Sequence, residues 1–115
     1  MSDVTRQAIV VYRGTSAFLQ FTMEQKGSIA GQTHVFTARS TPQSPDPPAL
    51  SIPAQHLDEG SDSTPGVITV TITKFQTLTL APGHYVFSLE RTDGDLEDLL
   101  ALGTMTVQAD VLHAL

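Results

Sequence analysis

Apolar and polar residues alternate with a period of two along much of this chain. The clearest run spans 66–73, where Ile68, Val70 and Ile72 alternate with threonines. Strict alternation over this length predicts a half-buried β-strand, and β-branched residues favour such a pleated surface. The chain is therefore expected to consist of short strands that each turn one face toward a core.

Turn residues divide the pattern into separate strands. Strands are expected over 9–12, 16–24, 33–40, 66–73, 83–92 and 98–109, and the proline-rich segment 41–53 is expected to be a stiff connection or, around 50–52, a short edge strand. Segment 74–80 is expected to cross between sheets with one helical turn, and 57–65 to form an acidic loop. Short strands separated by turn signals predict an all-β, immunoglobulin-like Greek-key sandwich of about seven antiparallel strands, with a small closed barrel as the alternative.

The parity of apolar positions predicts which residues face the core. Those expected to point inward are Leu19, Phe21, Met23, Phe36, Ala38, Ile68, Val70, Ile72, Met105, Val107 and Ala109. His34 shares the parity of Phe36 and Ala38, so we expect it to be buried and hydrogen-bonded. His84 is expected to face solvent.

The stretch 80–87 carries the strongest fold signal. A Pro82-Gly83 turn opens directly into a strand that contains Tyr85. A tyrosine at this place resembles the tyrosine corner of immunoglobulin-like sandwiches, whose hydroxyl bonds back across the preceding loop. Phe87 then stands where an antibody domain has its second cysteine. Pro82, Gly83 and Tyr85 are therefore predicted to be structural residues.

Length and charge narrow the class of protein. The 115 residues suit one domain, 1–115, with short tails at 1–7 and 110–115. The chain has no cysteine, so the sandwich must hold without a disulfide. Net charge is −6 and the basic residues are scattered, so we expect neither nucleic-acid nor membrane partners.

Residues that could carry chemistry are sparse. The histidines His34, His56, His84 and His113 fall on four elements without metal-ligand spacing. The densest acidic group, 93–98, lacks the pattern of a calcium loop, so a solvated turn is expected. Neither a Gly-x-Ser-x-Gly elbow nor a phosphate-binding glycine loop occurs. We therefore expect no catalytic residue, no cofactor and no metal.

Six landmarks follow one another along nearly the whole chain. They are Tyr-Arg-Gly-Thr at 12–15, Leu-Gln-Phe-Thr at 19–22, a glycine and a strand ending in Arg-Ser at 31–40, Gly-Val-Ile-Thr-Val at 66–70, Leu-Ala-Pro-Gly-His-Tyr at 80–85, and a leucine pair, a glycine and Thr-Val-Gln-Ala-Asp-Val at 99–111. Their order resembles a family of small immunoglobulin-like virion proteins of tailed bacteriophages, similar to the N-terminal domain of the lactococcal phage upper baseplate protein.

This resemblance implies a non-enzymatic structural protein of a phage particle. Such a protein would be made in the host cytoplasm, carried in the virion in many copies or as a homo-oligomer, and bound to the major capsid protein or tail proteins. The chain ends about six residues after the last expected strand, so no distal module is expected. That ending favours capsid decoration or cementing, with a tail or baseplate adaptor as the alternative.

The C-terminal tail is unusually apolar. Val111, Leu112 and Leu115 are expected to dock on a neighbouring subunit, together with 1–7, unless Val111 and Leu112 simply complete the last strand. Two other classes stay open. A carbohydrate- or host-surface-binding module would need exposed aromatic rings, for which Phe18 and Phe75 are the candidates, and a calcium-dependent adhesin-like domain would need 93–98.

Overall fold

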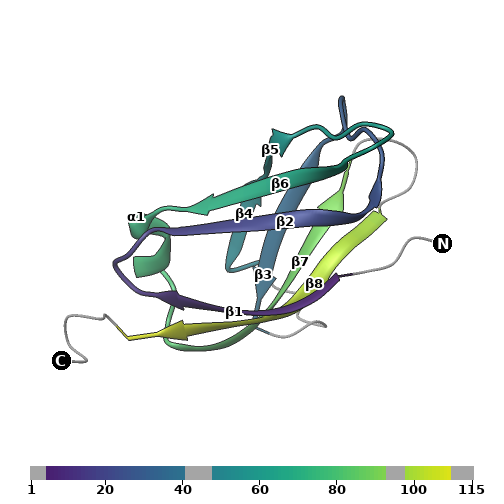
Figure 1. Cartoon of the computed structure of the whole chain (residues 1–115). Helices are drawn as coiled ribbons and strands as arrows, with labels where there is room; N and C mark the ends of the chain where they lie inside the picture. Colours follow the sequence, from purple (N-terminus) through teal and green to yellow (C-terminus); the bar gives the residue numbers. More distant parts are fainter. Residues whose placement is uncertain (1–4, 41–47, 93–97, 110–115) are drawn as a thin grey trace.

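Two β-sheets lie face to face and enclose one hydrophobic core (Figure 1). The structure, a computed structural model, describes residues 5–40, 48–92 and 98–109. The tail residues Val111, Leu112 and Leu115 and residues 93–97 of the acidic group lie outside the described residues. The docking of the tail on a neighbouring subunit therefore stays a prediction, and so does the solvated turn expected in place of a calcium site at 93–98.

Eight strands and one short helix are described. In chain order they are β1 (Thr5–Tyr12), β2 (Ala17–Lys26), β3 (His34–Arg39), β4 (Leu50–Pro53), β5 (Gln55–Asp58), β6 (Pro65–Ile72), α1 (Lys74–Leu78), β7 (Gly83–Arg91) and β8 (Asp98–Gln108).

The strands form one five-stranded and one three-stranded sheet. Their orders are β1-β8-β7-β3-β4 and β2-β6-β5. Two separate packed sheets confirm the predicted immunoglobulin-like all-β sandwich rather than the closed barrel. Neighbouring strands are antiparallel except β1 and β8, which run parallel from Thr5 opposite Ala101 to Tyr12 opposite Gln108. No hairpin joins these two strands, so no turn forces them to be antiparallel.

Two strand boundaries differ from the expectation. β5 covers part of the segment expected as an acidic loop. The sequence did not predict this strand because its residues are mostly exposed and show no apolar alternation. Its pairing with β6, not its own pattern, makes it a strand. β1 begins at Thr5, so residues 5–7 belong to the sheet rather than to an N-terminal tail.

The core follows the predicted parity. Buried as expected are Phe21, Phe36, Ala38, Ile68, Val70, Ile72, Met105 and Val107. Leu19 and Met23 are partly buried against this cluster. Ala109 is exposed, contrary to the expectation, because β8 ends at Gln108 and the alternation ends with it.

Three phenylalanine rings join the two sheets at the centre of the core. Phe21 comes from β2, Phe36 from β3 and Phe87 from β7, with ring centroids 5.4–6.4 Å apart. Aromatic pairs at these separations stabilise a core beyond the area they bury. In this chain, which has no cysteine, these rings contribute to joining the two sheets by packing.

Candidate functional site

The turn before β7 has the geometry of a tyrosine corner. The Tyr85 hydroxyl donates a hydrogen bond to the carbonyl of Ala81 at 2.7 Å. Gly83 has a φ angle of +149°, a backbone conformation that residues other than glycine rarely adopt. The turn residues therefore shape the loop and offer no reactive group.

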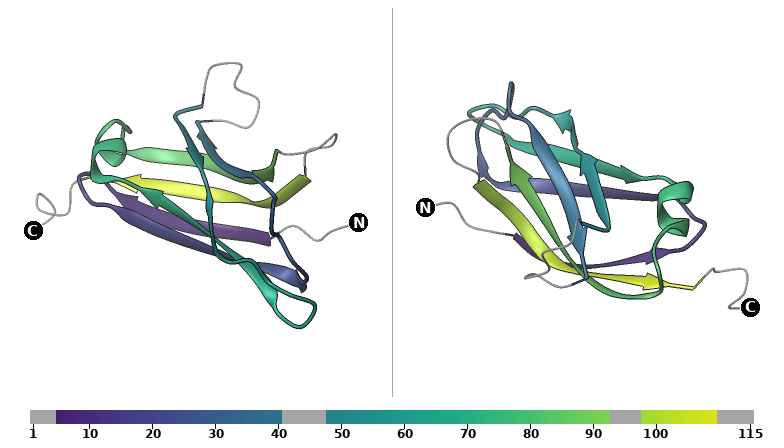
Figure 2. Two further views of the ribbon diagram at one scale, coloured as in Figure 1. Left: turned by 90° about the horizontal axis from the view of Figure 1, so that it is seen from above. Right: turned by 180° about the vertical axis from the view of Figure 1, so that it is seen from behind.

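The Arg-Gly landmark after β1 anchors α1. The Gly14 amide donates to the buried Thr77 hydroxyl at 3.0 Å, and that hydroxyl donates to the carbonyl of Lys74 at 2.9 Å. An Arg13 guanidinium nitrogen donates to the carbonyl of Leu78 at 3.1 Å. The β1–β2 turn and α1 consequently lie at the same end of the sandwich, as both views in Figure 2 show.

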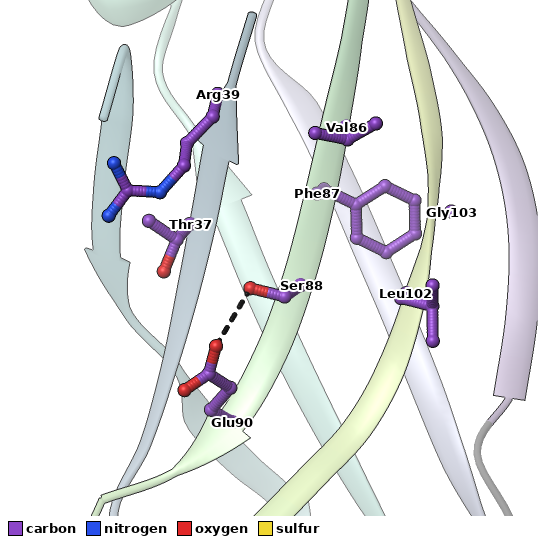
Figure 3. Close-up of a pocket in the computed structure, with 8 residues that line it drawn as sticks. All are labelled: Thr37, Arg39, Val86, Phe87, Ser88, Glu90, Leu102 and Gly103. Carbon is purple, nitrogen blue, oxygen red and sulfur yellow. Dashed lines mark hydrogen bonds between the residues drawn. The ribbon is translucent and has the colours of Figure 1, made fainter. Parts of the chain in front are cut away.

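A shallow pocket opens on the five-stranded sheet (Figure 3). Its lining residues are Thr37, Arg39, Val86, Phe87, Ser88, Glu90, Leu102 and Gly103. Phe87 and Gly103 line it between β7 and β8, next to Leu102 (Figure 3), while the Phe87 ring itself packs in the core. The Ser88 hydroxyl donates to Glu90 Oε1 at 3.1 Å, and no histidine lines this pocket to act as its base. Ser88 and Glu90 thus place a hydroxyl and a carboxylate side by side in this pocket.

A second hollow lies over a pair of histidines. His34 is 2% exposed, and its Nδ1 lies 3.2 Å from Nε2 of His56. Nε2 of His34 lies 3.2 Å from Gln32 Oε1, and Nδ1 of His56 lies 3.8 Å from Glu59 Oε2. A buried, hydrogen-bonded His34 was predicted and is confirmed.

The partner of His34 could not be predicted from spacing. His56 lies 22 residues away on the other sheet, so only the packing of the sheets brings the rings together. His84 is exposed, as predicted, and its Nδ1 lies 3.2 Å from the Thr106 hydroxyl. Within the described residues, no three histidine or acidic side chains gather in a way that could hold a metal ion.

Large apolar side chains are exposed at the α1 end. Phe18, at the start of β2, is 79% exposed, and Phe75 of α1 is 70% exposed. Tyr12 and Leu78 are 44% and 46% exposed near the same turn. The Lys74 ammonium lies 5.3 Å from the centroid of the Phe75 ring. The expectation that Phe18 and Phe75 are exposed is confirmed.

In the described part of the chain, no helix has the length and apolar character needed to span a membrane. No protein-family model and no curated protein matches the sequence. Structural matches include a chain from a photo-crosslinking study of multimeric cell-adhesive interactions of VGSC beta subunits. That chain is 10% identical in sequence to this one, and the superposition has a TM-score of 0.44 and covers 95% of each chain.

Another structural match is a family 123 glycoside hydrolase from Clostridium perfringens. It has 12% identity and a TM-score of 0.42, and the match covers 91% of this chain but 23% of the hydrolase. At this level of similarity, neither structure indicates what this chain binds or whether it catalyses a reaction.

Proposed function

We propose that this chain is a non-enzymatic structural protein of a tailed-phage particle and decorates or cements the capsid. It is made in the host cytoplasm, is present in many copies and binds the major capsid protein. The observation that carries the proposal is the ordered set of sequence landmarks that resembles the phage family. Two of them make hydrogen bonds near the C-terminal end of α1: Arg13-Gly14 bonds to Thr77 and Leu78, and Tyr85 bonds to Ala81 in the loop that follows.

The exposed side chains of the α1 end supply a means of attachment. Phe18 and Phe75 present apolar area to solvent on a chain of net charge −6. Exposed aromatic side chains are enriched where proteins contact one another. Many weak contacts of this kind hold firmly when a shell presents them in many copies.

Cryo-electron microscopy of the phage particle whose genome encodes this chain tests the proposal. Density for the sandwich on the capsid lattice is the expected result. Density only at the tail or baseplate would replace decoration by an adaptor role. Absence from the particle would overturn the proposal.

Deletion of residues 111–115 tests the contribution of the C-terminal tail. If Val111, Leu112 and Leu115 dock on a neighbour, the truncated chain should enter particles less than the full chain. Equal incorporation at equal expression would show that the tail is dispensable for assembly.

A carbohydrate- or host-surface-binding module is the second candidate, because Phe18 and Phe75 are open to a sugar face. A glycan array separates the two functions. Specific binding that is lost in Phe75→Ser and kept in Tyr12→Phe would favour the module over the virion role.

A further inference from the structure

β1 lies at the margin of the five-stranded sheet, beside β8 (Figure 1). The Arg13 amide donates to the carbonyl of Gln108 on β8 at 3.2 Å. Because backbone groups point alternately to the two sides of a strand, the N–H and C=O groups of Ala8 and Val10 point away from β8. No strand among the described residues pairs with this side of β1. We call this side the open edge of β1.

The other described edge strands each have a feature that hinders pairing with a further strand. β4 has four residues and ends at Pro53. β5 also has four residues, and its register with β6 is irregular. The register of β2 with β6 shifts after Thr22. β1 contains no proline and pairs with β8 over 8 residues without a shift. Shortness, proline and irregularity protect sheet edges from association, and β1 has none of them.

The surface along the open edge carries no acidic residue. Ala8 and Val10 are exposed on the outer face of β1, and Val10 is 53% exposed. The chain has 12 acidic residues and a net charge of −6, yet none of these residues lies in 4–23 or 99–108. These two ranges contain β1 and all but the first residue of β8. Two copies of this acidic chain can therefore meet along the open edge without bringing carboxylates together.

We propose that two copies of this chain pair through the open edges of their β1 strands, antiparallel and about a two-fold axis. The backbone groups of the two edges then satisfy one another, and the two five-stranded sheets join into one continuous sheet. A second copy fits this edge because it presents the same regular strand without acidic residues. A two-fold axis also uses the same patch on both copies, which closes the assembly at a dimer. The pairing does not depend on the proposed virion role.

The backbone restricts the register of this pairing. In an antiparallel pair, opposite residues that exchange hydrogen bonds must both point their N–H and C=O groups toward the other strand. The condition is met when Ala8 of one copy lies opposite Val10 of the other and Arg6 lies opposite Tyr12. This register engages every outward-pointing residue of β1. A shift by two residues in either direction would place Arg6 or Tyr12 opposite a residue outside the strand.

Sedimentation equilibrium of the whole chain over a range of concentrations tests the pairing. The expected result is a reversible equilibrium between monomer and dimer that goes no further, because the dimer occupies the open edge of both copies. A monomer at every concentration would overturn the proposal. An assembly that keeps growing with concentration would also overturn it, since such growth requires two different surfaces on each copy.

Val10→Pro removes an N–H group of the open edge and leaves the hydrogen bonds to β8 in place. The dissociation constant of the dimer should rise at least about fivefold, because one hydrogen bond per copy is lost. Ser51→Pro is the matched control on β4. The Ala54 amide donates to the carbonyl of His34 on β3, so by alternation the Ser51 backbone points away from β3. Equal dissociation constants in the two variants would contradict the proposed edge.

Two double variants test the register without proline, at positions whose exposed side chains the fold does not require. Ala8→Lys with Val10→Lys places like charges opposite each other and should weaken the dimer. Ala8→Lys with Val10→Glu places opposite charges there and should bring the dissociation constant back toward that of the original chain. A register shifted by two residues would set like charges opposite each other in both variants. Equal dissociation constants in the two double variants would therefore refute the proposed pairing.

Discussion

At the residue scale, the packing of three phenylalanine rings joins the two sheets, and the chain has no cysteine that could form a disulfide between them. Phe21, Phe36 and Phe87 bring rings from both sheets within 6.4 Å of one another. Each of these residues is at most 2% exposed. A disulfide would constrain the unfolded chain, whereas this cluster acts only in the folded state. Stability should therefore depend strongly on each ring.

Phe36→Ala should lower the free energy of unfolding by about 3–5 kcal/mol, because it leaves a cavity between the other two rings. Urea denaturation measures the change. Phe18→Ala is the matched control, since Phe18 is 79% exposed, and its effect should stay within about 0.5 kcal/mol. Similar losses in both variants would argue against a central role for the cluster.

Tyr85→Phe keeps the ring and removes the hydroxyl that reaches Ala81. The loss of this hydrogen bond should cost about 0.5–1.5 kcal/mol in the free energy of unfolding. Tyr12→Phe removes a hydroxyl from a side chain that is 44% exposed and should cost less. If the two variants unfold at the same urea concentration, the corner is not a stabilising contact.

At the element scale, the parallel pairing of β1 with β8 depends on one glycine. Gly103 lies opposite Gln7 in this pair. A Cβ at Gly103 would collide with the backbone oxygen of Gln7 and would lie 2.9 Å from Cε2 of Phe87. The absence of a side chain thus lets β1 lie against β8 over the Phe87 ring.

Gly103→Ala should displace β1 from β8 and lower the free energy of unfolding by about 1–3 kcal/mol through overpacking. Hydrogen exchange should show loss of protection first in the amides of β1. Thr104→Ala, at the exposed neighbouring position, serves as the control. Unchanged protection in β1 would mean that the two strands shift to admit the methyl group.

At the scale of the whole molecule, the side chains that stabilise the core differ from those to which we assign the proposed attachment. The core aromatic rings are buried, while Phe18 and Phe75 are exposed at the α1 end. Exposed apolar side chains add little to the stability of a monomer and are available to a partner. The two roles can therefore be separated by mutation.

The double variant Phe18→Ser and Phe75→Ser should unfold within about 1 kcal/mol of the original chain, because neither ring is buried. Its incorporation into phage particles should fall at equal expression, as measured by immunoblotting of purified particles. Phe18→Leu with Phe75→Leu retains apolar area and should restore part of the incorporation. Undiminished incorporation of the serine variant would exclude this end as the attachment surface.

The local sequence determined most of the strands and the fold class. Short backbone segments have conformational preferences that can be inferred without knowing which segments pack against them. Examples are the alternation at Ile68, Val70 and Ile72 and the Pro82-Gly83 turn before Tyr85. The exposure of Phe18 and the burial of His34 followed from parity in the same way.

Only the tertiary structure decided which distant residues meet. β5 has no apolar alternation of its own and is a strand because it pairs with β6. β1 and β8 lie far apart along the chain and meet only as neighbours in the five-stranded sheet. The His34–His56 contact arises between two sheets, so no spacing along the chain encodes it. Local preferences select strands and turns, whereas the contacts between residues far apart in the sequence come from packing across the sandwich.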